Sequence, residues 1–281
     1  MESSDRDRRY RPVAYFVTAY LAAWVPWLIG AHLARQEGGE VHGFLFTLLG
    51  LLLGPTGAAL FFVASSGSLA LKRDFRDRII DLRRIRPLYA LVAVFLPFVL
   101  MGLAIGVSLG FGESPDQFAL AGGPGLGVMV GLAMVLAPIL EETGWHGYGV
   151  DSLRAHASMW AATLLFAVLW CVWHAPLVLV RGSYQHQLAQ MDNPLFVINF
   201  FISILPVAFV ANWLYYKNRR SIVGAVLVHT MFNGSAVLLN AGQVAKGIAT
   251  VLYCLVAAAI AGSDREFREG PRDFLPREPG A

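Results

Sequence analysis

The feature that most constrains this chain is a series of long apolar runs that hold almost no Asp, Glu, Lys or Arg. Only 15% of the 281 residues are charged and 56% are hydrophobic, whereas soluble domains carry about 25% charged residues. A helix needs roughly 20 apolar residues to cross the hydrocarbon core of a bilayer. The composition therefore excludes a soluble globular protein and predicts an all-α, polytopic membrane helical bundle.

Hydropathy divides the chain into about eight transmembrane helices. The expected spans are 12–34, 43–70, 88–110, 124–148, 157–180, 194–216, 222–240 and 246–262. The expected organisation is a cytoplasmic basic N-terminus over 1–11, a single transmembrane domain over 12–262 and a tail over 263–281. We expect the tail to be cytoplasmic and disordered, because prolines and charged residues dominate it.

The distribution of basic residues predicts the orientation of the spans. With eight spans, all but three of the 22 Lys and Arg residues fall on the face that carries both termini, and the three are Arg35, Arg181 and Lys246. Positive residues concentrate on the cytoplasmic side of a membrane protein, so we expect both termini inside (N-in/C-in). The net charge of +3 follows from this topology. The expected partner is the lipid bilayer and not a nucleic acid.

The basic segment 72–86 has two interpretations. Its charges alternate with Phe75, Ile79, Ile80, Leu82 and Ile85, a pattern that fits an amphipathic helix on the cytoplasmic surface. The same segment also fits a solvated loop that only fixes the topology. The sequence does not decide between them.

Polar side chains within the spans are the strongest pointer to function, because ionisable groups in a membrane are costly and mark functional sites by default. Those expected at or near membrane depth are Glu141, Glu142, His146, His174, His229 and Asn233. His229 and Asn233 are four residues apart and therefore share a helix face. Taken singly, each His or Asn is more typical of a structural hydrogen bond between helices. Taken together, in spans otherwise free of charge, they favour a site.

These residue types suffice for hydrolysis of an amide without a covalent intermediate. Glu141 is a candidate general base towards water, and His174 can hold that water or pass a proton onward. His229 and Asn233 offer two donors for a developing oxyanion. The set Glu141, His174 and His229 is also a plausible zinc site, although the sequence lacks the H-E-x-x-H signature of zinc proteases.

Three motifs resemble those of the CPBP (CAAX protease and bacteriocin-processing enzyme) family of intramembrane proteases, which includes the type II CAAX prenyl endopeptidases. The stretch "EETGWH" resembles the family's E-E-x-x-x-R, "WCVWHAP" its F-x-x-x-H followed by proline, and "HTMFN" its H-x-x-x-N. The motifs occur in the family's order and spacing, and eight spans are also what the family implies. The resemblance implies that Glu141 activates water with help from His174. It further implies that His229 and Asn233 stabilise the oxyanion and that Glu142 supports the site.

The chain departs from the family's motifs at two positions. Trp170 replaces the motif phenylalanine, which we expect to be a mild exchange, and His146 replaces the arginine. A histidine lacks the permanent charge and forked donors of a guanidinium, although His146 can still pair with Glu142 one turn back. The second exchange therefore leaves open whether the chain is catalytically competent.

We therefore expect an intramembrane endopeptidase that cleaves near the C-terminus or the membrane-proximal region of a peptide or lipidated protein. The alternatives are an inactive membrane scaffold of the same fold and, less favoured, a proton-coupled transporter, whose matched interrupted spans the sequence lacks. Neither a metal nor another cofactor is favoured, and zinc or another divalent cation is the alternative. The Arg- and Ala-rich composition is compatible with a bacterium, so we expect a multi-pass protein of its plasma membrane with the active-site cavity open to the cytoplasm.

Overall fold

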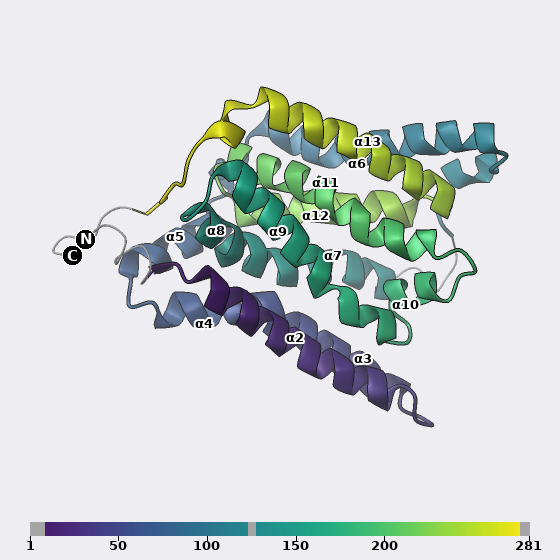
Figure 1. Cartoon of the computed structure of the whole chain (residues 1–281), viewed down its shortest axis with the longest axis horizontal. Coiled ribbons are helices and arrows are strands. Elements are labelled where there is room, and N and C mark those ends of the chain that lie inside the picture. Colours follow the sequence, from purple (N-terminus) through teal and green to yellow (C-terminus); the bar gives the residue numbers. More distant parts are fainter. Residues whose placement is uncertain (1–8, 123–127, 276–281) are drawn as a thin grey trace.

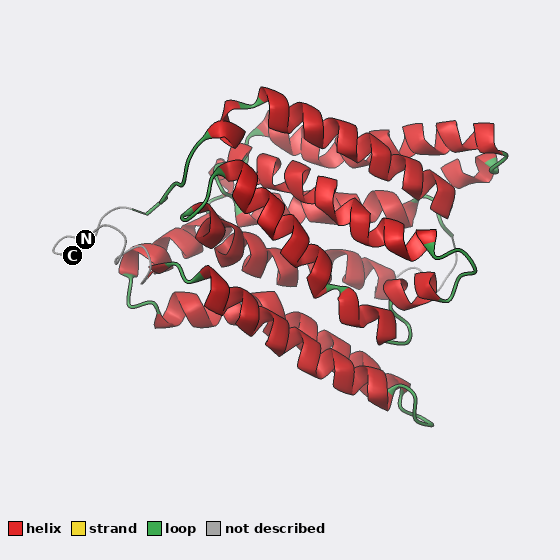
Figure 2. Ribbon diagram, in the orientation of Figure 1, coloured by secondary structure: helices red, strands yellow, loops and turns green. Residues whose placement is uncertain are grey.

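Long helices lie side by side along the long axis of the molecule, and the two termini of the described chain lie at the same end of it (Figure 1). The computed structural model describes residues 9–122 and 128–275. Within these residues the chain is helical apart from its connections and an isolated bridge between Leu120 and Leu239 (Figure 2). The helices are α2 (Pro12–Leu33), α3 (Glu40–Leu51), α4 (Ala58–Ser65), α5 (Leu69–Ile80), α6 (Pro87–Ser108), α7 (Val128–Gly144), α8 (Val150–Arg154), α9 (Met159–Trp173), α10 (Tyr184–Ala189), α11 (Leu195–Lys217), α12 (Ile222–Leu238) and α13 (Gln243–Ser263).

The described helices confirm an all-α, multi-pass membrane protein. Six are long and apolar enough to cross a bilayer, namely Pro12–Leu33, Glu40–Ser65, Pro87–Phe111, Met159–Leu179, Leu195–Lys217 and Gln243–Ser263. Helix α12 is apolar but shorter, and residues 123–127 of the expected fourth span lie outside the described residues. The total of eight spans stays a prediction.

Two π-helical turns interrupt the bundle, and they meet at the glutamate motif. One turn, Leu52–Gly57, joins α3 to α4, and the other, Trp145–Gly149, joins α7 to α8. Gly144 lies so close to the first turn that a Cβ atom there would stand 2.2 Å from the carbonyl carbon of Pro55. Only glycine fits at this contact, so it fixes the end of α7 against the kinked second span. Turns of this kind occur frequently at functional sites.

The basic segment after the second span forms a helix rather than a loop. The side chain of Ser68 accepts a hydrogen bond from the Leu71 main-chain N–H and so caps α5, as small hydroxyl residues commonly do. One face of α5 is buried against the rest of the molecule through Leu71, Phe75 and Arg78. Helix α5 and α8 lie at the end of the molecule that carries both termini (Figure 1).

The tail expected to be disordered is ordered over residues 264–275. Phe267 is buried and its ring stacks on Phe209. The Arg154 guanidinium donates a hydrogen bond to the Gly270 carbonyl, and Asp273 pairs with Arg9 at 2.9 Å. The prediction was wrong for this stretch because its aromatic and acidic residues find partners on the basic end of the bundle. Residues 1–8 and 276–281 of the expected termini lie outside the described residues.

Candidate active site

A cavity of about 630 Å³ lies within the bundle and brings together residues from separate helices. Its lining includes four of the candidates from the sequence, Glu141, His174, His229 and Asn233. Glu141 comes from α7, His174 follows the last residue of α9, and the other two come from α12. The predicted convergence of these four side chains on one cavity is therefore what the structure shows.

Local sequence signals place the helices that carry these residues. Ser158 caps α9 and Ser221 caps α12, each by accepting a hydrogen bond from a main-chain N–H of the first turn. Helix α9 ends just before His174, and Pro176 in the following 3₁₀ turn prevents the α-helix from continuing because proline lacks an N–H. His174 is thereby held at the end of its helix, where its ring faces the cavity.

Glu141 and His174 are both tied to Trp170. The indole Nε1–H of Trp170 donates to Glu141 Oε2 over 3.0 Å, and His174 Nδ1 donates to the Trp170 carbonyl over 2.8 Å. With Nδ1 used in this way, Nε2 of a neutral His174 ring is left as an acceptor. A phenylalanine at position 170 has no donor, so the exchange from the motif residue adds a hydrogen bond to the glutamate and is not merely mild.

Glu142 lies behind the cavity and joins two histidines. It is 2% exposed and does not line the cavity. Its Oε1 accepts from His229 Nδ1 over 2.7 Å, and its Oε2 contacts His146 Nδ1. A buried carboxylate without partners is strongly destabilising, and Glu142 avoids this cost by pairing on both oxygens. The pair of glutamates thus divides into one that faces the cavity and one that holds α7 to α12.

His146 continues this hydrogen-bonded chain away from the cavity. Its Nε2 lies 2.9 Å from Asn212 Oδ1, and Asn212 Nδ2 donates to Thr163 Oγ1 over 3.0 Å. Asn212 and Thr163 are fully buried. The chain of contacts therefore runs from His229 at the cavity, through Glu142 and His146, to α11 and α9.

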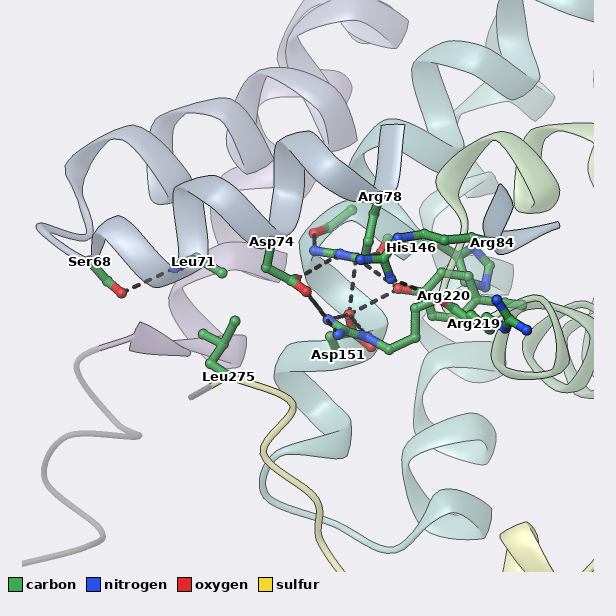
Figure 3. Close-up of polar contacts among 12 residues, drawn as sticks. Ser68, Leu71, Asp74, Arg78, Arg84, His146, Asp151, Arg219, Arg220 and Leu275 are labelled. Carbon is green, nitrogen blue, oxygen red and sulfur yellow. Dashed lines mark hydrogen bonds and ion pairs between the residues drawn. The ribbon is translucent and has the colours of Figure 1, made fainter. Parts of the chain in front are cut away.

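A buried cluster of two arginines and two aspartates supports the turn that contains His146 (Figure 3). Arg78 donates to the carbonyls of His146 and Gly147 over 2.8 and 2.7 Å, and its Nη1 lies 3.0 Å from Asp151 Oδ2. These contacts satisfy carbonyl groups of the π-helical turn, as buried main-chain groups require.

Arg220 completes the cluster by joining α8 to α5. It donates to Asp151 and also forms a bidentate pair with Asp74, at 3.0 and 2.9 Å. Arg219 and Arg220 adopt left-handed backbone conformations, with φ of 52° and 62°, a strain of order 1 kcal/mol or more each that the surrounding contacts must offset. The ring of Phe274 from the C-terminal stretch covers the Arg220 guanidinium at 4.2 Å.

Sequence reasoning missed several of these partners. Asn212 could have been noticed as an amide in an otherwise apolar span, the same signal that identified Asn233. Nothing in the sequence distinguished Arg78 from its basic neighbours in the 72–86 segment, because only the tertiary structure shows which of them is buried. Trp170 was identified, but its role as a donor to Glu141 depends on the distance between two helices.

The cavity reaches the surface at the end of the bundle that lacks the basic segments. Its lining includes the exposed residues Gly182, Tyr184 and Gln187, and α10 lies at the opposite end of the molecule from α5 and α8 (Figure 1). The two predictions on orientation therefore disagree. If both termini are in the cytoplasm, the mouth of the cavity faces the other side of the membrane.

The metal site named from the sequence, Glu141 with His174 and His229, stays a prediction. Within residues 9–122 and 128–275, no group of three or more His, Cys, Asp or Glu side chains is positioned to hold a metal ion. The Nδ1 atoms of His174 and His229 are occupied by Trp170 and Glu142, and Glu141 Oε2 by the Trp170 indole. Nε2 of each histidine takes no part in these contacts, and a histidine that ligates a metal through one nitrogen commonly donates its other N–H to a carbonyl or carboxylate in this way.

Comparisons with known proteins agree with the motifs. The family model "Type II CAAX prenyl endopeptidase Rce1-like" matches residues 123–235, which include the six candidate residues. The chain is 35% identical to CAAX prenyl protease 2 of Methanococcus maripaludis over 263 residues, covering 92% of this chain and 96% of the relative. Because this identity extends over nearly the whole length of both chains, this multi-pass membrane protein belongs to the CAAX prenyl protease family.

Proposed function

We propose that this protein is an intramembrane endopeptidase in which Glu141 activates water to cleave a peptide bond near the C-terminus of a peptide or lipidated protein. The observation that carries the proposal is the convergence of Glu141, His174, His229 and Asn233 on one cavity inside an apolar bundle. The name of the Methanococcus maripaludis relative, CAAX prenyl protease 2, supports a prenylated C-terminal substrate.

The hydrogen-bond directions support separate roles for the two histidines. Glu141 would take one proton from water while the water oxygen bonds to the substrate carbonyl carbon, and His174 Nε2 would accept a hydrogen bond from the remaining O–H of that water. The C–N bond then breaks and the proton passes to the leaving amine, which yields a carboxylic acid and an amine. The oxyanion would be stabilised by the Asn233 amide and by Nε2–H of a protonated His229, whose charge Glu142 balances at Nδ1.

The test is cleavage of quenched C-terminal peptides, prenylated and plain, by the purified full chain. We expect Glu141→Gln to lower kcat by about 10²–10⁴-fold, the contribution typical of a positioned general base, without lowering the unfolding temperature. Thr47→Ser serves as a matched control, since Thr47 lines the same cavity but offers no base. Each protein is assayed with and without a chelator.

Three outcomes would count against the proposal. Undiminished cleavage by Glu141→Gln would remove the glutamate from the mechanism. Loss of activity on chelation that zinc restores would replace the glutamate mechanism by a metal-dependent one. A silent wild type that becomes active as His146→Arg would identify the chain as an inactive member of the family, which is the scaffold alternative.

A further inference from the structure

Within residues 9–122 and 128–275, one cation on the cavity wall has no anionic partner. Among the described residues that line the cavity, Lys246 is the one Lys or Arg. Its Nζ donates to the Tyr184 hydroxyl over 3.2 Å and lies 5.1 Å from the centre of the Tyr184 ring. In the part of the chain that the structure describes, no carboxylate stands within ion-pair distance of this ammonium group. Lys246 is therefore oriented at the mouth of the cavity with its charge available.

The surroundings of Lys246 are polar, in contrast to the apolar interior of the cavity. Gln243 Nε2 donates to the same Tyr184 hydroxyl over 3.3 Å, and Gln185 and Gln187 also line this part. A lysine near a helix end in a membrane protein commonly extends to the lipid headgroups. Here the contacts with Tyr184 hold the ammonium at the opening instead.

The distance between Lys246 and His229 along the helix axes is about the length of a short extended peptide. Helix α12 continues nine residues beyond His229, a short loop follows, and Lys246 lies in the first turn of α13. At 1.5 Å per residue, Lys246 therefore lies roughly 9 Å nearer the mouth than His229 along the helix axes. Three extended residues span about 10 Å. A chain end held at Lys246 would thus place a peptide bond about three residues upstream at the depth of His229.

We propose that Lys246 binds the free C-terminal carboxylate of the substrate and so selects cleavage close to the chain end. This inference rests on the proposed function, because it assigns the substrate's end to one position in the same cavity. An ammonium–carboxylate contact is a charge-assisted hydrogen bond, and it is stronger at a partly desolvated mouth than on an open surface. The Tyr184 hydroxyl and the nearby glutamines supply further polar contacts at this end of the peptide.

The test compares peptides that differ only at their C-terminus, one ending in a carboxylate and one in an amide. The full chain is assayed in nanodiscs of neutral phosphatidylcholine, so that no anionic lipid competes for the lysine. We expect the wild type to prefer the peptide that ends in a carboxylate. Lys246→Ala should raise KM for that peptide about tenfold and leave KM for the amide peptide unchanged. Lys246→Arg should retain the preference. Arg181→Ala is the control, because Arg181 is exposed at the same end but outside the cavity lining.

The proposal fails if Lys246→Ala retains the preference for the carboxylate. It also fails if the substitution raises KM for both peptides equally, as loss of a structural or lipid-facing lysine would. Binding of the same labelled peptides to Glu141→Gln and to Glu141→Gln/Lys246→Ala separates this proposal from the proposed function, because binding needs no hydrolysis. A carboxylate preference that depends on Lys246 in binding supports the subsite even if no peptide is cleaved. Equal binding of both peptides by Glu141→Gln overturns it.

Discussion

His146 occupies the position of the family's arginine, and its pocket is built for a histidine. The ring is 1% exposed, its centre lies 4.5 Å from that of Tyr215, and its two nitrogens face Glu142 and Asn212. Both partners present oxygen atoms to the ring, so each of its nitrogens faces an acceptor. The ring makes two directed contacts, which is part of what an arginine would supply. Asn212 thus gives the second nitrogen of His146 a partner.

We expect His146→Arg alone to harm the protein, because the longer side chain has no room beside Asn212. Overpacking of this kind costs about 1–3 kcal/mol, which should lower the unfolding temperature in detergent and reduce cleavage. Asn212→Ser shortens the neighbour, so the double variant should recover part of both losses, and a double-mutant cycle measures this coupling. If His146→Arg alone is more stable and more active than the wild type, the pocket accommodates arginine better than histidine, which contradicts this prediction.

Among the contacts between elements, the site depends most on the one between the end of α7 and the π-helical turn Leu52–Gly57. Gly144 follows the glutamate pair by two residues and lies against Pro55, and Thr56 donates to the Leu140 carbonyl. The end of α7 therefore has little freedom to shift relative to the second span. Since Glu141 and Glu142 lie on this last turn, their positions depend on that contact.

Gly144→Ala should therefore reduce activity and stability together. The new Cβ would meet main-chain atoms of Pro55 at 2.2 and 2.3 Å, and rigid backbone cannot move aside as a flexible side chain would. We expect a loss of at least about 1–3 kcal/mol, seen as a lower unfolding temperature, and a lower kcat. Gly247→Ala on α13 is the matched control, because a Cβ there meets no atom within 4 Å and alanine favours the helix. Equal tolerance of both substitutions would contradict the role assigned to the contact.

Asp151 links α8 to α5 and gives the stability of the protein a dependence on pH. Burial raises the pKa of its carboxyl group, but the guanidinium groups of Arg220 and Arg78 outweigh burial, so its pKa lies below its usual value. Its contribution to stability is therefore fully present above the unfolded pKa, about 3.9, and is lost as pH falls through the lower folded pKa. For this reason we expect the unfolding temperature to decrease when the pH is lowered below about 4.

Asp151→Asn should remove that part of the acid dependence and lower stability at neutral pH. Taking away one partner of a buried charge cluster typically costs about 3–5 kcal/mol, because the opposite charges are left uncompensated. Asp77→Asn is the control, since Asp77 pairs with Arg76 at the surface, where such pairs are worth about 0–1 kcal/mol. Thermal unfolding of the three proteins between pH 3 and 8 measures both effects. If the unfolding temperature of Asp151→Asn decreases by the same amount at low pH as that of the wild type, other carboxylates cause the acid dependence.

At the scale of the whole molecule, the sequence predicted the helices and the four cavity residues but not the supporting contacts. Apolar runs have a required length, so Pro12–Leu33 and Leu195–Lys217 matched the expected 12–34 and 194–216 closely. Glu141 and His229, which the motifs single out, line one cavity. The burial of Arg78 and the packing of Phe267 depend instead on segments far apart in the chain, and a local pattern carries no information about them. The prediction of disorder was wrong over residues 264–275 for the same reason.

The orientation of the molecule is where two sound predictions conflict, and a labelling experiment decides between them. The basic segments at the end with both termini predict that this end is cytoplasmic, which puts Ser183 at the cavity mouth on the far side. We therefore expect Ser183→Cys, with Cys171 and Cys254 replaced by alanine, to react with a membrane-impermeant maleimide in intact cells. Arg76→Cys on α5, exposed at the basic end, should react only after permeabilisation. The reverse pattern would mean that the cavity opens to the cytoplasm and that both termini lie outside, against the orientation that the basic residues predict. The expected pattern would instead direct the search for substrates to chain ends that reach the membrane from the opposite side.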